Sequence, residues 1–246
     1  NGIPCKAEHI SITAGAKHAL YLVLQTLIDP GDEVVLPTPA WVSYRPLIEL
    51  AGGRCVEVAG SMERGFKVLP EELAAAMTPR TVAVILNSPS NPCGITYTPD
   101  EIRALCEVIA RHPSAVLVSD EIYEKLLYKG AEFRCFASFG PDVAKRTIIV
   151  SGASKAYAMT GWRVGWMIGP KDLIKAATNL QSHLSSNVSN VSQRAAIAAL
   201  TGDLSAVHKM GEAFDRRRKL IVKLLNEIPG VSCPTPTGAF YVYPSV

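Results

Sequence analysis

The sequence has few aromatic residues and little excess charge. Aromatic residues make up 7% of its 246 residues, and the formal net charge is only +3. Proteins that attract nucleic acid electrostatically carry a larger basic excess, and no aromatic residue here is interleaved with a basic cluster. The basic run Arg216–Lys219 lies beside Glu212 and Asp215, a pattern typical of a solvent-exposed helix face. We therefore expect no nucleic-acid partner.

Metal and disulfide motifs are also missing from the sequence. The six cysteines are scattered without a C-x-x-C pair, and the five histidines show no metal-ligand spacing. Dispersed cysteines in a chain of this length are typical of reduced cytoplasmic thiols. There is no secretory signal, and no apolar run reaches the roughly 18 residues of a membrane span. We expect a cytoplasmic protein with no metal and no membrane partner.

Apolar residues are plentiful and their pattern alternates between strand and helix. Hydrophobic residues make up 48% of the chain and charged residues 19%, which is enough apolar material for a large core. The expected strands are continuous Val/Ile/Leu runs, which favour a mostly parallel sheet. We predict an α/β fold in three layers (α/β/α), with helices on both sheet faces. Strands are expected at 9–13, 33–36, 54–58, 81–86, 115–118, 147–150, 164–168 and 239–243, and helices near 14–27, 41–50, 70–77, 98–111, 171–184, 191–200 and 203–227.

The stretch Gly152–Gly165 places Lys155 among small and apolar residues, with Arg163 eight positions later. A lysine amine is nucleophilic only when deprotonated, and burial or a nearby cation lowers its pKa. A guanidinium can grip a phosphate bidentately, and neighbouring glycines let the backbone approach a bulky anion. A lysine for a carbonyl and an arginine for a phosphate are what pyridoxal 5'-phosphate requires. Taken alone, the lysine could equally be an ordinary surface residue.

Three further polar residues follow expected strands. Asp120 ends an apolar strand, where it could pair with a protonated pyridine nitrogen or serve as a cap or ion-pair partner. Tyr123 could donate to a phenolic oxygen of the cofactor or pack in the core. Asn91, before Pro92, could reach the same oxygen or simply form a turn. Because ligands of parallel sheets gather beyond the carboxyl ends of strands, we expect Asn91, Asp120 and Lys155 to lie together.

Two other segments could contribute to such a site. Gly15, Ala16 and Lys17 open a helix directly after a strand, so their free N–H groups could face a phosphate. Small residues are common at helix starts, which makes this signal weak alone. Trp41 lies between Pro39 and the next expected helix, and its ring could stack on a cofactor ring or pack in the core.

Taken together, these motifs resemble one family. Gly152–Gly165 looks like the cofactor-attachment signature of class I pyridoxal-phosphate aminotransferases. The segments 87–94 and 118–123 resemble that family's loops in the expected order, and 39–44 and 158–163 look most like bacterial aspartate aminotransferases, including those that accept prephenate. The resemblance covers essentially the whole chain.

The resemblance implies the large domain of the type I pyridoxal-phosphate transferase fold and a specific set of roles. Lys155 would form the internal aldimine and then move the substrate's α-proton, and Asp120 would pair with the pyridine nitrogen. Catalytic residues would thus be Lys155, Asp120 and Tyr123. The implied reaction moves the amino group of aspartate or a similar amino acid to 2-oxoglutarate, in a homodimer with the active site at the subunit interface. Cofactor contacts would come from Gly15, Ala16, Lys17, Trp41, Asn91, Asp120, Tyr123, Ser154, Lys155 and Arg163, and substrate contacts from Trp41 and Asn91.

The sequence departs from the family pattern at two positions. Gly152 stands where many members have a phosphate-binding serine, so Ser154 or Ser151 is expected to compensate. Cys93 stands where threonine is usual, with no evident consequence.

We expect both ends of the chain to be truncated. Residues 1–202 would form the large cofactor-binding domain, and 203–246 a connecting helix and the first strand of a small domain. The arginine that grips the substrate α-carboxylate would then lie outside these residues, so an isolated fragment should transaminate poorly.

Two alternatives stay open at this stage. A lyase, decarboxylase or synthase with the same cofactor would share Lys155, Asp120 and Arg163. Aminotransferase-like domains also occur as ligand-sensing modules behind the DNA-binding domains of bacterial regulators, and the upstream coding sequence would distinguish that case.

Overall fold

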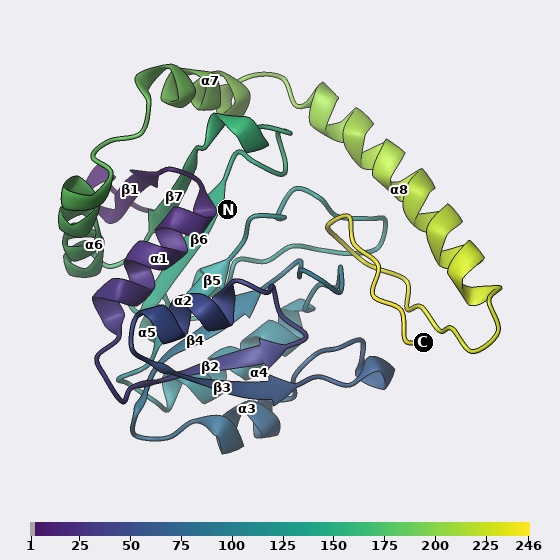
Figure 1. Cartoon of the computed structure of the whole chain (residues 1–246), viewed down its shortest axis with the longest axis horizontal. Helices are drawn as coiled ribbons and strands as arrows, with labels where there is room; N and C mark the ends of the chain where they lie inside the picture. Colours follow the sequence, from purple (N-terminus) through teal and green to yellow (C-terminus); the bar gives the residue numbers. More distant parts are fainter. Residues whose placement is uncertain (1–2) are drawn as a thin grey trace.

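A single mixed sheet forms the centre of the molecule (Figure 1). The computed structural model describes residues 3–246, and within them seven strands run in the order β1-β7-β6-β5-β4-β2-β3. All neighbours are parallel except β7, which is antiparallel to both β1 and β6. The α/β prediction with a mostly parallel sheet is therefore confirmed. The strands are β1 (Ile10–Thr13), β2 (Glu33–Thr38), β3 (Arg54–Ala59), β4 (Thr81–Asn87), β5 (Val116–Asp120), β6 (Thr147–Gly152) and β7 (Gly165–Ile168).

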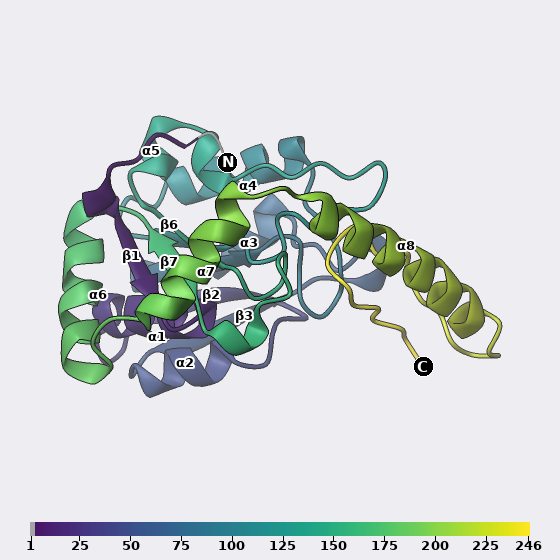
Figure 2. The ribbon, with the colours of Figure 1, turned by 90° about the horizontal axis from the view of Figure 1, so that it is seen from above.

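Helices cover both faces of this sheet, as predicted (Figure 2). Helices α1, α2 and α6 pack on one face and α3, α4 and α5 on the other. No helix within residues 3–246 is both long and apolar enough to cross a membrane. The helices are α1 (Ala16–Leu27), α2 (Tyr44–Leu50), α3 (Pro70–Ala76), α4 (Pro99–Ala110), α5 (Pro141–Ala144), α6 (Lys171–Leu184), α7 (Asn190–Thr201) and α8 (Ser205–Asn226), with short 3-10 turns η1 (Ala7–His9), η2 (Met62–Arg64), η3 (Phe136–Ser138) and η4 (Thr160–Trp162).

The continuous apolar runs reflect a sheet that is buried on both sides. Successive strand residues point to opposite faces, so Val34 packs beneath α1 and α2 while its neighbour Val35 packs against the α3 and α4 side. Ile85 and Val84 of the central strand β4 divide in the same way. Positions in the centre of the sheet therefore favour apolar side chains on both faces, whereas the edge strand β3 is partly exposed and includes Arg54 and Glu57.

Three predicted elements differ from the structure. Strand β2 continues through Pro37 to Thr38, paired with β3. Its pairing with β4 ends at Val35, so the N–H that Pro37 lacks would have had no partner on the β4 side. Helix α2 begins at Tyr44 rather than near Trp41. The strand predicted at 239–243 is wrong, because these residues form no ladder and only the flanking Gly238 and Ser245 make isolated bridges.

Helix α8 extends beyond the sheet layers (Figures 1 and 2). None of its residues is buried, and Leu220 and Leu224 of its apolar stripe are exposed. The interpretation of Arg216–Lys219 as a purely solvated face is wrong for Arg218. Its guanidinium lies 4.2 Å from the Tyr128 ring centroid and donates to the Pro236 carbonyl at 2.6 Å. This side chain therefore ties α8 to the C-terminal segment.

A buried carboxylate links the amino-terminal ends of neighbouring strands. Glu33 at the start of β2 is fully buried, and Arg54, Arg80 and Thr78 donate hydrogen bonds to it. These hydrogen bonds lower the pKa of Glu33 to about 2 from 4.5, with the Arg54 bond contributing most. Because the folded-state pKa is depressed, this carboxylate stabilises the fold above its unfolded pKa and loses that effect as pH falls.

We predict that Glu33→Gln lowers the free energy of unfolding at pH 7 by about 1–3 kcal/mol, the range for hydrogen bonds to a charged group. The deficit should shrink as pH falls from 4.5 towards 2, where the wild-type carboxylate itself protonates. Urea unfolding across this pH range measures it. The matched control is Glu57→Gln, which removes an exposed pair with Arg45 and should change stability by less than about 1 kcal/mol. Equal losses in both variants, or a Glu33 deficit that is flat with pH, would contradict the assignment.

Candidate active site

The predicted site residues meet at the carboxyl ends of three parallel strands. A cavity of about 330 Å³ opens there. Asn87 ends β4 opposite Asp120, which ends β5 and lies opposite Val150 of β6. Only Gly15 of the predicted residues does not line the cavity, and it lies directly behind Arg163. The predicted residues in the lining are Ala16, Lys17, Trp41, Asn91, Asp120, Tyr123, Ser154, Lys155 and Arg163.

Asp120 is a buried carboxylate at the floor of this cavity. Tyr44 donates to its Oδ2 at 2.7 Å, and the Ile122 amide donates to Oδ1 at 3.1 Å. Burial raises the pKa of Asp120 to about 6, although these hydrogen bonds and the charge of Lys155 act in the opposite direction. A cationic ring nitrogen placed here would relieve the cost of burying the charge, since a close positive partner favours the ionised carboxylate.

Lys155 follows the end of β6 and is only partly buried. Burial lowers the pKa of its amine, and the charge of Arg163 lowers it further, whereas Asp120 raises it. Its Nζ lies 6.0 Å from the ring centroid of Tyr123 and 5.6 Å from that of Phe240. An amine with a lowered pKa among aromatic rings is suited to attack a carbonyl.

Arg163 forms a cradle with the start of α1. Its guanidinium donates to the Thr160 carbonyl at 2.9 Å and to the Ala14 carbonyl at 3.2 Å. A Cβ added to Gly15, whose φ is +88°, would lie 2.5 Å from Arg163 Nη2, so only glycine permits this approach. The first backbone amides of α1, including that of Ala16, have no carbonyl partner within the helix. Guanidinium and free amides together form a site for an anion.

Trp41 and Lys17 form another wall of the cavity. The Lys17 Nζ lies 4.9 Å from the Trp41 ring centroid, and the Trp41 ring packs edge-on against Tyr44 at 5.4 Å. The lining therefore contains three cations, Lys17, Lys155 and Arg163, against the single carboxylate of Asp120. This balance favours an anionic ligand.

The departure at Gly152 has a structural cause. A Cβ at this position would lie 2.9 Å from both the Gly165 Cα and the Val164 carbonyl, so the close approach of β6 and β7 excludes a serine. Of the two candidates to compensate, Ser151 is buried and bonds to the Glu121 carbonyl, whereas Ser154 lines the cavity. Cys93 is buried, which raises the pKa of its thiol to about 12 and makes it unreactive.

Two tyrosines of the site were missed by the sequence reasoning. Tyr44 hydrogen-bonds Asp120 from 76 positions earlier in the chain, and Tyr241 lies 2.6 Å, oxygen to oxygen, from Tyr123 across 118 positions. Nothing in local sequence marks either residue, because both depend on tertiary packing.

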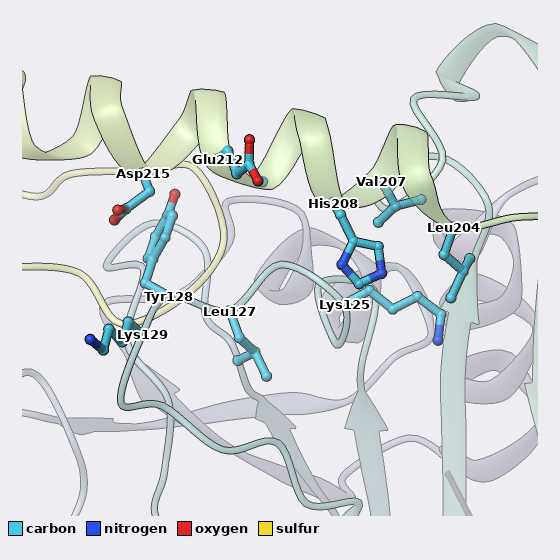
Figure 3. Close-up of a pocket in the computed structure, with 10 residues that line it drawn as sticks. Lys125, Leu127, Tyr128, Lys129, Leu204, Val207, His208, Glu212 and Asp215 are labelled. Atoms are coloured by element: carbon cyan, nitrogen blue, oxygen red, sulfur yellow. The ribbon is translucent and has the colours of Figure 1, made fainter.

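A second cavity of about 460 Å³ lies between α8 and residues 125–129 (Figure 3). Its ionisable residues include Lys125, His208 and Glu212, but none of the predicted site residues lines it. No cluster of metal-binding side chains occurs in the part of the chain that the structure describes. The cavity at the strand ends is therefore the candidate active site.

The cavity fits the expected pyridoxal 5'-phosphate in three respects. Gly15 lets the Arg163 guanidinium lie against the start of α1, and Gly165 lets β7 approach the Ala16 amide, so the guanidinium and the first amides of α1 lie close together. The buried Asp120 lacks a cationic partner in direct contact, and Lys155 offers an amine with a lowered pKa. Together they match the cofactor's phosphate, ring nitrogen and carbonyl carbon.

Comparison with known proteins agrees with this geometry. The family model for aminotransferase class I and II matches residues 1–246. An aspartate aminotransferase of Streptomyces avermitilis is 52% identical over the whole chain, and an aspartate/prephenate aminotransferase of Cereibacter sphaeroides is 48% identical over the whole chain. The crystal structure of an aspartate aminotransferase from Rhizobium meliloti superposes with a TM-score of 0.97 at 43% identity, covering 100% of this chain and 61% of that one. The chain spans 60% and 62% of the length of the first two relatives.

We predict that Asp120 titrates near pH 6 in the ligand-free protein and that Tyr44→Phe raises its midpoint by about 1 pKa unit or more, because a hydrogen bond to the charged form is lost. Difference infrared spectroscopy of the protonated carboxyl measures this, and Asp120→Asn identifies the band. An unchanged midpoint in Tyr44→Phe would show that this hydrogen bond does not control the carboxylate.

Proposed function

Because this chain belongs to the class I and II aminotransferase family, we propose that its full-length protein transfers the amino group of aspartate or a similar amino acid to 2-oxoglutarate, using pyridoxal 5'-phosphate held by Lys155. One observation carries the proposal: Lys155, Asp120 and Arg163 converge on a single cavity from three separate segments. As in most members of this fold class, we propose a homodimer as the working form.

Each residue has a role that its surroundings support. Arg163, the first amides of α1 and Ser154 bind the phosphate. Asp120, held by Tyr44, would pair with the cofactor's ring nitrogen and favour its protonated form. When bound, the cofactor supplies an electron sink that stabilises negative charge at the substrate α-carbon.

Proton movement falls to Lys155. Its amine has a lowered pKa, so a larger fraction is neutral and able to accept a proton at neutral pH. The Lys155 Nζ lies in the cavity, where it would accept and return the α-proton of a bound substrate. Tyr123 and Asn91 would hold the cofactor's phenolic oxygen, and Trp41 would lie against its ring.

The preference for an acidic substrate rests on Lys17. Its ammonium lies over the Trp41 ring within the cavity, and no carboxylate among residues 3–246 forms an ion pair with it. A positive charge over the ring favours substrates that carry a second carboxylate. Aspartate and 2-oxoglutarate both do.

We predict that the full-length protein loaded with cofactor shows a visible absorption band of the lysine-linked form, and that Lys155→Ala abolishes it. Absorption spectra after removal of free cofactor measure this. Lys125→Ala, which changes a lysine in the second cavity, is the matched control and should keep the band. A band that survives in Lys155→Ala would refute Lys155 as the attachment site.

We predict that full-length protein mixed with aspartate and 2-oxoglutarate forms glutamate, and that Lys17→Met raises KM for aspartate about tenfold, as expected for loss of a charge-assisted hydrogen bond. KM for an uncharged donor such as alanine should change far less. Cofactor affinity measured alongside separates substrate from phosphate effects. Absence of glutamate, with another amino donor active, would overturn the aspartate assignment.

A further inference from the structure

Tyr241 reaches the candidate site from the far end of the chain. Its hydroxyl lies 2.6 Å from that of Tyr123, and the two rings meet edge to face with centroids 5.6 Å apart. Tyr241 also lines the cavity that holds Asp120 and Lys155. It is therefore the only cavity-lining residue of the described chain that comes from beyond α8.

The segment that carries Tyr241 is fixed to the two loops that border the site. The amides of Thr237 and Gly238 both donate to the Gly94 carbonyl at 2.8 Å. The Ala239 amide donates to the Leu126 carbonyl, also at 2.8 Å. These bonds tie residues 237–239 to the loop after β4 and to the segment after β5, so the backbone holds Tyr241 in place.

Helix α8 reinforces this attachment through Tyr128, which lies beneath the helix (Figure 3). The Tyr128 hydroxyl donates to the Ala239 carbonyl at 2.6 Å, while Arg218 of α8 covers the Tyr128 ring. A buried phenol capped by a guanidinium gives the segment a second anchor. The position of the Tyr241 hydroxyl is thus set by contacts outside the cavity.

The protons of the tyrosine pair allow two arrangements. Burial is the main cause that raises the pKa of both Tyr123 and Tyr241, so both keep their protons at neutral pH. Two hydroxyls in contact share one hydrogen bond, in which one donates and the other accepts. If Tyr123 donates to Tyr241, its proton is engaged and cannot be donated to another acceptor in the cavity. If Tyr241 donates, the Tyr123 proton is free for an acceptor inside.

An anionic acceptor in the cavity decides between these arrangements. Tyr123 has a single proton, and a negatively charged phenolic oxygen is a stronger acceptor than a neutral hydroxyl. Once Tyr123 donates to that oxygen, the short contact with Tyr241 can persist only with Tyr241 as donor. That second hydrogen bond polarises Tyr123 and strengthens its donation into the cavity.

The geometry points to Tyr241 as a positioning residue whose hydroxyl donates to Tyr123 and turns the Tyr123 proton toward the cofactor's phenolic oxygen, an inference that rests on the function proposed above. In this proposal Tyr241 acts on the site through its hydrogen bond with Tyr123 rather than on the reacting atoms. The C-terminal segment therefore strengthens the hydrogen bond that Tyr123 donates in the cavity, whereas all other lining residues come from positions up to Arg163.

The test is a spectroscopic titration of the full-length protein loaded with cofactor. Weaker donation by Tyr123 leaves more negative charge on the phenolic oxygen, which holds the proton on the lysine-linked nitrogen more tightly. In Tyr241→Phe the pKa of the visible band should therefore rise by about 0.5–1 unit, the equivalent of one hydrogen bond. The thermal midpoint of the cofactor-free variant should stay near the wild-type value, because phenylalanine keeps the ring contacts.

A double-mutant cycle tests whether Tyr241 acts through Tyr123. Tyr123→Phe alone should raise the pKa of the band further than Tyr241→Phe does, and adding Tyr241→Phe to it should change nothing more. The matched control is Tyr243→Phe, whose ring packs on Phe66 and is 38% exposed, and whose band should titrate as in the wild type.

The outcomes separate this inference from the proposed function. If the wild-type protein gives no lysine-linked band, the proposed function fails and the inference falls with it. If the wild type gives the band and Tyr241→Phe titrates identically, the inference alone is overturned. Additive shifts in the double variant would also overturn it, because Tyr241 would then act independently of Tyr123.

Discussion

A buried carboxylate at the end of β5 is the constraint around which the rest of the site is arranged. Desolvation disfavours the ionised form of Asp120 strongly enough to keep its pKa raised despite two hydrogen bonds and a nearby lysine. Such a group persists when a cationic ligand completes its surroundings. Tyr44, which belongs to α2, donates a hydrogen bond to this carboxylate and is itself buried on the sheet face that α1 and α2 cover. The fold therefore maintains a carboxylate whose environment is completed only by a positive partner.

Parallel strands in register explain why the remaining groups meet there. Because β4, β5 and β6 end at one edge, the loops that follow them bring Asn91, Tyr123 and Lys155 to the same place. The antiparallel strand β7 then returns the chain past β6 so closely that Gly152 and Gly165 admit no side chain between them. This close return brings Arg163 to the start of α1, where it lines the same cavity as Asp120.

Much of this could be read from the sequence, since it depends on local pattern. Apolar runs located the strands, and the polar residues directly after them located Asp120 and Lys155. Tyr44 and Tyr241 could not be found in this way, because each meets its partner only after distant segments pack together. The strand predicted at 239–243 failed for a related reason: its residues bond to loops rather than to a neighbouring strand. The hydrophobic periodicity of a segment indicates which of its residues can be buried, but it does not indicate which other segment they contact.

Under the proposed function, the site has two tasks: it binds the cofactor, and it selects the substrate by charge. In this proposal, cofactor binding falls to Asp120, Lys155 and Arg163, which line one cavity. Charge selection of the substrate falls to Lys17, whose ammonium lies over the Trp41 ring, and Trp41 in turn packs against Tyr44. Of these two side chains, only Trp41 contacts the tyrosine that holds the buried carboxylate. Under this proposal, a substitution of Lys17 therefore changes the charge offered to the substrate and leaves the hydrogen bond between Tyr44 and Asp120 in place.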